Sequence, residues 1–446
     1  MSIIADAQGY FDQLVTWATA GLSGDEILLA TFDGEATDFI RFNNGEIRQA
    51  GSVQQATMSL DLIEGSRHTE GSVVLARDVA VDQQRVGQLI SQLRDQRRLV
   101  SEDPFLLFNT QVQSSEPTGG NALPTPEDAL GDIRDAAGSS DLVGIYAAGD
   151  TSNGFANSLG QRNWHQTAMF NLDWSFYLRA DKAAKNLYAG FTWDDAAFAQ
   201  KVDWSRRQLA VLEREPIDLE PGHYRTYLAP AAIQELVDLW SWGGFGEKSH
   251  RTKQTPLLKM VTDGATLSSE VRISEDTAGG VAPNFQESGF LRPDEVVLVD
   301  GGRYHDTLVS PRSAREYGVE TNGASSWEAP DSLAMASGSI PTANTVEELA
   351  TGLYVGNLWY TNFSDRSACR TTGMTRFATF WAEGGEITAP VNVMRFDDTP
   401  YSLLGDKLVG LTDEADVILD SSTYEQRSTV SFRLPGALVE EMAFTL

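Results

Sequence analysis

The spacing of apolar residues near the start of the chain predicts a helix followed by a strand. Tyr10, Leu14 and Trp17 recur at helical spacing, so we expect a helix over residues 5–21. The run 26–32 that comes after a Ser-Gly turn has the composition of a strand. The chain therefore opens as a mixed structure.

Turn residues then separate several short alternating runs. Residues 38–47 have the pattern of a hairpin with Asn-Asn-Gly at its turn, and the runs 56–63 and 71–75 are joined by Glu-Gly-Ser. An amphipathic helix over 79–99 is expected to pack across the resulting antiparallel sheet. We expect several short strands here.

A stretch rich in Pro, Ser and Gly interrupts this pattern at residues 101–141. It predicts a linker with one short helix after Thr125, where Pro and Glu follow. Strands are expected again at 142–148 and 168–180, and a helix over 193–213 closes this part of the chain.

The pattern changes after that helix. Residues 216–221 (PIDLEP) have the composition of a boundary, and the rest of the chain is rich in strand, glycine and turn residues. One helix is distinct there, at 230–242, with its apolar residues on a single stripe. We predict an α+β fold, with an N-terminal domain of helices and antiparallel sheet over 1–215 and a β-rich C-terminal domain over 216–446.

Composition narrows the functional classes. The 446 residues are 41% apolar, which is enough for the cores of two or three domains. The formal net charge of -29 disfavours nucleic acid as a ligand, because phosphate binding needs clustered cations. Neither a signal sequence nor an apolar run of membrane-spanning length is present in the pattern, so we expect a soluble, cytoplasmic protein without a membrane partner.

Individual residues suggest little chemistry of their own. Glu247 and His250 have the spacing that places a carboxylate and an imidazole on one helix face, although the surrounding GGFGEKSHRTK favours a loop. Cys369 is the single cysteine and lies near Arg366 and Arg370, which would lower the pKa of an exposed thiol. These two features leave open a stand-alone hydrolase that uses the thiol or a metal other than zinc.

A series of short motifs resembles the TldD/PmbA family, the peptidase-related proteins also described as modulators of DNA gyrase. The motifs are RFNNGEI at 41–47, IEGSR at 63–67, ANSLG at 156–160, LEPGHY at 219–224, Pro230 with the helix after it, and WAEGGEITAP at 381–390. Their order along the chain, and not any single motif, carries the resemblance.

The resemblance implies a PmbA (TldE)-like subunit. TldD-like subunits carry an HExxxH zinc helix and a distant cysteine ligand, whereas the helix at 230–242 presents Gln234, Glu235 and Asp238 on its polar side. The region 421–428, which is comparable to the family's cysteine turn, contains no cysteine. Because catalytic zinc needs imidazole or thiolate ligands and an open position, we expect no catalytic residue, metal or other cofactor in this chain.

The resemblance also implies a partner. PmbA-like subunits pair with zinc-bearing TldD-like subunits, and the pair encloses a chamber that cleaves unfolded or leader peptides. We expect such a heterodimer, or a homodimer, with the peptide bound as an added strand. A homodimeric peptide-binding scaffold without catalysis is the alternative. The residues predicted to bind peptide are Lys248, His250, Arg251, Arg366, Arg370 and Arg376.

Overall fold

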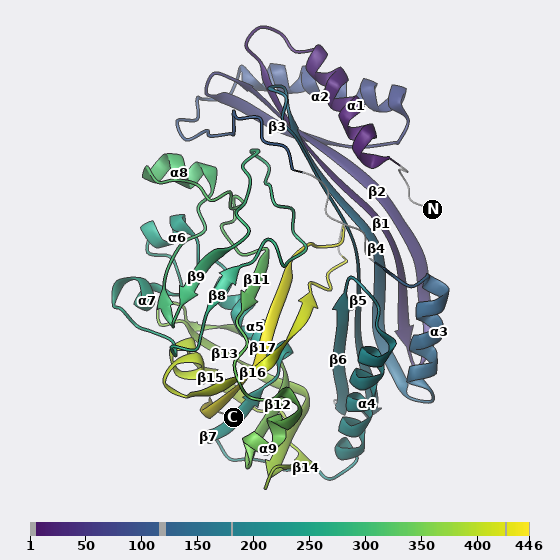
Figure 1. Cartoon of the computed structure of the whole chain (residues 1–446), viewed down its shortest axis with the longest axis vertical. Helices are drawn as coiled ribbons and strands as arrows, with labels where there is room; N and C mark the ends of the chain where they lie inside the picture. The colour runs from purple at the N-terminus through teal and green to yellow at the C-terminus, as the bar shows by residue number, and fades with distance from the viewer. Residues whose placement is uncertain (1–5, 116–121, 180–181, 424–425, 446) are drawn as a thin grey trace.

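The computed structural model describes residues 6–115, 122–179, 182–423 and 426–445. The strands described form two sheets that lie beside each other along the molecule (Figure 1). The first sheet has the order β3-β2-β1-β4-β5-β6, and all its neighbouring strands are antiparallel. The elements of this part are α1 (Ala7–Ala20), β1 (Ile27–Asn43), β2 (Glu46–Glu64), β3 (Arg67–Val74), α2 (Val79–Arg97), α3 (Pro126–Ala137), β4 (Asp141–Asn157), β5 (Arg162–Arg179), β6 (Lys182–Gly190) and α4 (Asp195–Leu212).

The second sheet is mixed, since β11 pairs in parallel with β17 and β12 pairs in parallel with β7. The elements of this part are β7 (Gly222–Leu228), α5 (Pro230–Ser241), α6 (Glu247–Arg251), α7 (Leu258–Thr262), β8 (Ile273–Glu275), β9 (Val296–Asp300), β10 (Arg303–Tyr304), α8 (Pro311–Tyr317), β11 (Ser332–Met335), η1 (Thr342–Asn344), α9 (Thr345–Leu349), β12 (Gly352–Asp365), β13 (Arg370–Glu383), β14 (Glu386–Pro390), β15 (Arg395–Asp398), η2 (Ser402–Asp406), β16 (Leu408–Leu419) and β17 (Ser431–Phe444). The predicted α+β fold class is confirmed. The domain boundary near residue 215 stays a prediction, and it falls in the connection between α4 and β7.

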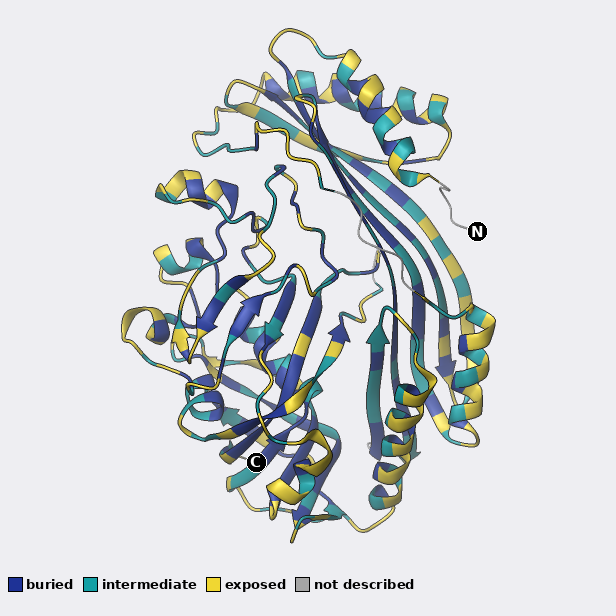
Figure 2. Ribbon diagram, viewed as in Figure 1, coloured by how far each residue is buried: buried dark blue, intermediate teal, exposed yellow. Residues whose placement is uncertain are grey.

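One face of the first sheet is apolar and covered by helices. Alternate residues of a strand point to opposite faces, and the apolar residues that β1, β2, β4 and β5 turn toward the helices are even-numbered. Phe32 and Trp164 pack with α1 and α2 at one end of the face. Phe170 and Trp174 pack with α3 and α4 at the other end. Figure 2 shows the strands largely buried under helices whose outer sides are exposed.

The other face of the first sheet is polar and yet buried, because the C-terminal half covers it. The buried polar residues of this face include Glu35, Thr37, Thr151, Asn157, Asn163, His165, Thr167 and Asn171. Contacts from the C-terminal half hold several of them. For example, the Nε2 atom of His165 lies 3.0 Å from the carbonyl oxygen of Val281.

The polar residues of this face explain why the strands predicted from the sequence were too short. The runs predicted as separate strands at 26–32 and 38–47 lie largely in one strand, β1, because the polar residues between them pair in register with both β2 and β4. The predicted short strands are therefore long ones. The hairpin turn itself is confirmed: Asn44 and Gly45 have φ angles of 54° and 71°, as this type of turn requires.

Local signals placed the helices of this half correctly. The short helix expected after Thr125 is α3, and the Oγ1 atom of Thr125 accepts the N–H of Asp128 at 3.1 Å. The helix expected over 193–213 is α4, which is capped by Asp194. Part of the predicted linker, residues 116–121, lies outside the described residues.

A buried carboxylate in the second sheet predicts an unusual dependence of stability on pH. Burial raises the pKa of Glu275 from 4.5 to about 7, and the negative charge of Asp331 adds to this effect. The folded state then holds the proton more tightly than the unfolded state, so stability falls as pH rises from 4.5 to about 7. Relative to Glu275→Gln, the wild type should lose about 2–3 kcal/mol over this interval. Urea unfolding at a series of pH values measures the difference.

Glu295→Gln is the matched control. A hydrogen bond from Arg272 lowers the pKa of Glu295, so its contribution to stability has the opposite sign and is lost only as pH falls below about 4.5. An identical pH profile for the wild type and Glu275→Gln would contradict the prediction.

Candidate functional site

Helix α5 carries the positions at which the resemblance places a degenerate zinc motif. The helix begins at Pro230, where the missing N–H of proline costs no helical hydrogen bond. Its stripe of apolar residues is buried in the core of the second sheet. The residues of this stripe are Ile233, Leu236, Val237 and Trp240. This burial fixes the rotation of α5, and its polar side points away from that core.

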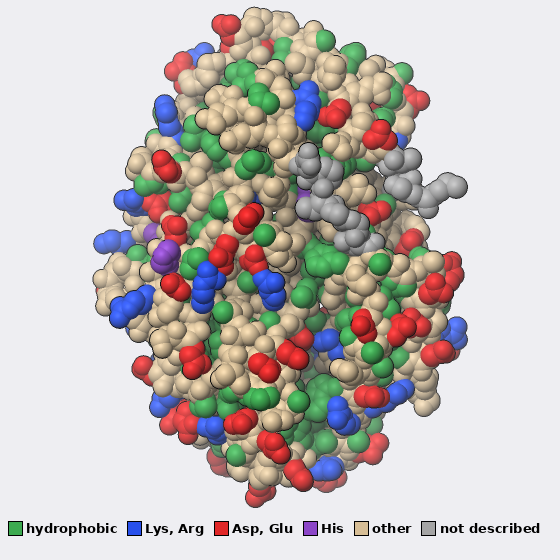
Figure 3. Space-filling view, in the orientation of Figure 1, with side chains coloured by type: hydrophobic (Ala, Val, Ile, Leu, Met, Phe, Trp, Pro, Cys, Tyr) green, Lys and Arg blue, Asp and Glu red, His purple; other side chains and the backbone are tan. Residues whose placement is uncertain are grey.

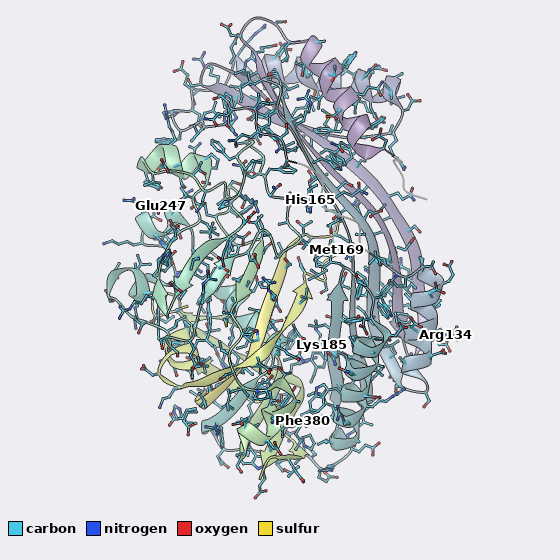
Figure 4. The ribbon with its side chains drawn as sticks, viewed as in Figure 1. Arg134, His165, Met169, Lys185, Glu247 and Phe380 are labelled. Carbon is cyan, nitrogen blue, oxygen red and sulfur yellow. The ribbon has the colours of Figure 1, made fainter. Side chains whose placement is uncertain are left out.

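The polar side of α5 faces a cavity between the two sheets. Gln234, Glu235 and Asp238 line this cavity, which has a volume of about 410 Å³. The other lining residues include Asn171 and Asp173 of β5, Lys185 of β6 and, after β16, Asp420. Figure 4 places Lys185 between the two sheets. Three positions noted from the sequence thus lie opposite residues that the sequence did not connect with them.

A larger cavity of about 1090 Å³ adjoins the first one. The two share Lys185, Leu187, Ala231 and Asn357 as lining residues, and the larger cavity continues between α4 on one side and β7 and β12 on the other. We call the two cavities together the inter-sheet trough. Figure 3 shows hydrophobic side chains along part of the line between the two halves of the molecule.

The smaller cavity is acidic. Lys185 lies 3.2 Å from Asp173, and Glu235, Asp238 and Asp420 add three further carboxylates. Burial raises the pKa of Asp238, and the charge of Asp420 raises it further. Burial likewise raises the pKa of Glu235, although Lys185 partly offsets the effect.

The donors in the trough do not fit a catalytic zinc. Catalytic zinc in peptidases takes imidazole or thiolate ligands, with a carboxylate only beside them, and keeps one position open for water. Among the described residues that line the trough, none is a histidine or a cysteine. Its polar lining offers amides, carboxylates, hydroxyls and cations, which suit hydrogen bonding to a ligand instead.

Three residues predicted to bind peptide lie away from the trough. Lys248, His250 and Arg251 belong to α6, which stands on the far side of the second sheet from Lys185, next to the labelled Glu247 (Figures 1 and 4). The loop predicted for this segment is wrong. A short helix forms because Glu328, distant in sequence, accepts the N–H of Lys248 at 2.8 Å in its first turn.

The pair Glu247 and His250 is already engaged within the protein. The Nε2 atom of His250 lies 2.8 Å from the carbonyl oxygen of Gly244, and the Nε atom of Arg251 donates to Glu247 at 2.6 Å. Burial lowers the pKa of His250. These contacts leave no open pair of ligands for a metal ion.

Cys369 is not placed to act as a nucleophile. The residue is fully buried, and burial raises the pKa of its thiol to about 12. The thiolate is the reactive form, so this environment opposes nucleophilic chemistry at neutral pH.

The other three predicted peptide-binding residues lie on the β12–β13 hairpin and its turn. Arg366 donates to the carbonyl oxygen of Trp242 at 2.9 Å. Arg370 pairs with Asp397 at 3.0 Å, and the guanidinium of Arg376 stacks over the ring of Trp359 at 4.1 Å. These arginines are engaged with their neighbours and do not line the trough.

The loop between β16 and β17 is a part of the site that sequence reasoning did not assign. Of the region 421–428, residues 424 and 425 lie outside the described residues. Ser421 lines the trough, and Arg427 inserts into the polar face of the first sheet. No local pattern marks Arg427, because its partners belong to a different half of the chain.

Comparisons with known proteins agree with this architecture. A family model described as PmbA/TldA metallopeptidase C-terminal domain matches residues 221–446, half of the chain. The chain belongs to the PmbA/TldD family. The membership implied by the sequence motifs is therefore confirmed. A search of curated proteins finds no match.

Solved structures similar to this chain extend over nearly its whole length. TldE from Thermococcus kodakarensis is 16% identical, with a TM-score of 0.75 and coverage of 98% of this chain and 100% of that chain. A putative modulator of DNA gyrase from Thermotoga maritima is 13% identical, with a TM-score of 0.74 and coverage of 98% and 99%. Another from Bacteroides thetaiotaomicron is 15% identical, with a TM-score of 0.76 and coverage of 99% and 100%. At these identities the likeness shows the fold. Among the described residues, no helix has the length and apolar character needed to cross a membrane.

Proposed function

We propose that this chain is the subunit without catalytic zinc in a TldD/TldE-type peptidase complex, and that it holds peptides in the inter-sheet trough. One observation carries the proposal: α5 stands in the trough wall, but Gln234, Glu235 and Asp238 occupy the side that faces the cavity. Amide and carboxylate groups at these positions favour peptide binding over metal chemistry. Membership of a metallopeptidase family supports a peptide as the substrate.

Strand β6, at the edge of the first sheet, supports binding of the peptide as an added strand. Within the described residues, β6 pairs only with β5, and Lys185, Asn186 and Leu187 of this strand line the trough. An extended peptide adds to such an edge through main-chain hydrogen bonds. We therefore infer that the peptide binds as a strand beside β6.

The cleavage chemistry then belongs to a partner. A TldD-like subunit in a heterodimer would supply the zinc and the attacking water, and this chain would present unfolded or leader peptides to it. Location in the cytoplasm and the lack of a nucleic-acid partner stay predictions from composition.

Peptidase assays of this chain alone, of a zinc-bearing TldD-like relative alone, and of the mixture test this function. We expect chelator-sensitive cleavage of an unfolded peptide to be greatest in the mixture. Chelator-sensitive cleavage by this chain alone would overturn the proposal. Peptide binding with no gain of cleavage in the mixture would instead favour the scaffold without catalysis.

A bulky substitution in the trough should weaken peptide binding. In Gln234→Trp the indole would fill part of the cavity that α5 faces, so we expect the Kd for a fluorescently labelled unfolded peptide to rise by about tenfold or more, which corresponds to about 1.4 kcal/mol. Fluorescence anisotropy measures the Kd, and circular dichroism checks the fold. Lys248→Ala on α6 is the matched control and should leave the Kd unchanged. A raised Kd for Lys248→Ala together with an unchanged Kd for Gln234→Trp would instead indicate that the peptide binds at α6.

A further inference from the structure

The hairpin of β2 and β3 brings three candidate metal ligands together, away from the trough. Asp61 and Glu70 lie directly opposite each other in the β2–β3 register, and His68 lies two residues before Glu70 on β3. All three stand on the sheet face that points away from α1 and α2. Like charges directly opposite each other destabilise a strand pair unless a cation lies between them.

The spacing of the three side chains fits one metal ion. One ligand atom from each of Asp61, His68 and Glu70 lies within 4.8 Å of the others. The Nδ1 atom of His68 is 3.0 Å from Asp61 and 3.9 Å from Glu70. In a tetrahedral zinc site with bonds of about 2.1 Å, neighbouring ligand atoms lie about 3.4 Å apart. The observed distances lie on either side of this value.

The second nitrogen of His68 faces a carboxylate, at a distance slightly longer than a hydrogen bond. Its Nε2 atom faces the carboxylate of Asp103 at 3.6 Å. Asp103 is itself held in place, because it accepts the N–H of Phe105 at 2.9 Å and a hydrogen bond from Arg312 at 2.5 Å. A ligating histidine commonly donates its other ring N–H to a carboxylate, which fixes its tautomer and orientation.

We propose that Asp61, His68 and Glu70 form a binding site for a divalent transition metal of the Zn²⁺ type, with Asp103 as the residue that orients the imidazole. One imidazole nitrogen and two carboxylates are suitable ligands for Zn²⁺ and poor ones for Mg²⁺, which prefers oxygen ligands in octahedral geometry. Glu70 is largely exposed, so water can complete the coordination.

This metal has a structural role and is independent of the proposed peptidase function. The site lies on the first sheet, near β3 in Figure 1, whereas the trough lies along β6 and α5. Through Asp103 and Arg312 the metal would connect the β2–β3 hairpin to α8 of the C-terminal half. Zinc bound to this chain would consequently not indicate a catalytic centre.

In the competing explanation, His68 is protonated and carries the positive charge between the carboxylates, and no metal binds. The pKa of His68 is raised, chiefly by its hydrogen bond to Asp61. An imidazolium could then be the cation that the two carboxylates hold. The two explanations differ in whether the chain takes up zinc.

Calorimetric titration of metal-stripped full-length chain with Zn²⁺ at neutral pH separates them. We expect one Zn²⁺ per chain, a Kd in the micromolar range or below, and much weaker binding of Mg²⁺. His68→Gln and Glu70→Gln should each raise the Kd for Zn²⁺ at least tenfold, and Asp103→Asn should raise it by about 10–100-fold, as for other orienting carboxylates. Because the Glu70 side chain is 73% exposed, Glu70→Gln tests the site with little risk to folding.

The control is His223→Gln, which removes an imidazole that is 67% exposed on the second sheet and should leave the Kd unchanged. Co²⁺ provides a second measurement: its visible absorption bands should form with the wild type and be lost in His68→Gln. The absence of zinc binding at tens of micromolar, or an equal Kd in the wild type, His68→Gln and Glu70→Gln, would overturn the proposal in favour of the imidazolium. Neither result would affect the peptidase assays of the mixed subunits.

Discussion

Arg427→Ala is expected to lower the free energy of unfolding by about 3–5 kcal/mol, the cost of removing one partner from a buried charged network. The guanidinium of Arg427 donates to the carbonyl oxygen of Met169 and to Asn171, both at 2.9 Å, and the backbone N–H of Arg427 donates to Glu35 at 3.2 Å. Without the guanidinium, the oxygen atoms of Met169 and Asn171 lose their donor. The buried carboxylate of Glu35 keeps its backbone hydrogen bond but loses the nearby positive charge. Urea denaturation measures the change.

The same substitution should loosen the attachment of the β16–β17 loop to the first sheet. Figure 4 shows Met169 on the sheet face that points toward the C-terminal half, and Arg427 reaches it from the loop after β16. We expect faster proteolytic cleavage in this loop. Arg98→Ala is the control: the Arg98 side chain is 76% exposed and lies 3.7 Å from Asp95, so its removal should change stability by less than about 0.5 kcal/mol. Equal effects of the two substitutions would contradict the prediction.

Leu236→Ala should lower the free energy of unfolding by about 2–5 kcal/mol. Leu236 is fully buried in the core of the second sheet, together with Val237 of the same helix. Truncation removes apolar contacts and leaves a cavity that the surrounding strands only partly fill. Urea denaturation again measures the change.

Gln234→Ala, two residues earlier on the trough side of α5, is the matched control for Leu236→Ala. This substitution should change stability by less than about 0.5 kcal/mol. A small effect of Leu236→Ala would mean that the packing of α5 contributes little to the fold. A large effect would show that packing against the core of the second sheet holds α5 in place.

A substantial part of the fold was predictable from local patterns. The stripe on α5 repeats every three or four residues, and its members are buried as that spacing requires. The Asn44-Gly45 turn and the helix after Thr125 also follow from short-range chemistry, since positive φ angles and capping hydroxyls act within a few residues. The family could be inferred as well, because its motifs keep their order along the chain.

The candidate site was only partly predictable. The sequence singled out Gln234, Glu235 and Asp238, but it did not indicate which residues would lie opposite them. Lys185 and Asp420 reach the same cavity from β6 and from the loop after β16. The predicted peptide-binding residues were selected for their charge alone, and charge does not show which side of a sheet a segment will occupy.

From the sequence we could infer the α+β class, the family, the helix α5 and the absence of histidine from it, since each depends on residues close together in the chain or on motif order. The fold was needed to reveal the long β1 strand, the buried polar face, the inter-sheet trough and the grouping of Asp61 with His68. These features arise from strand pairing and from the packing of two halves against each other. Polar residues on a covered face leave no apolar pattern, so their burial becomes evident only when the covering half is in place.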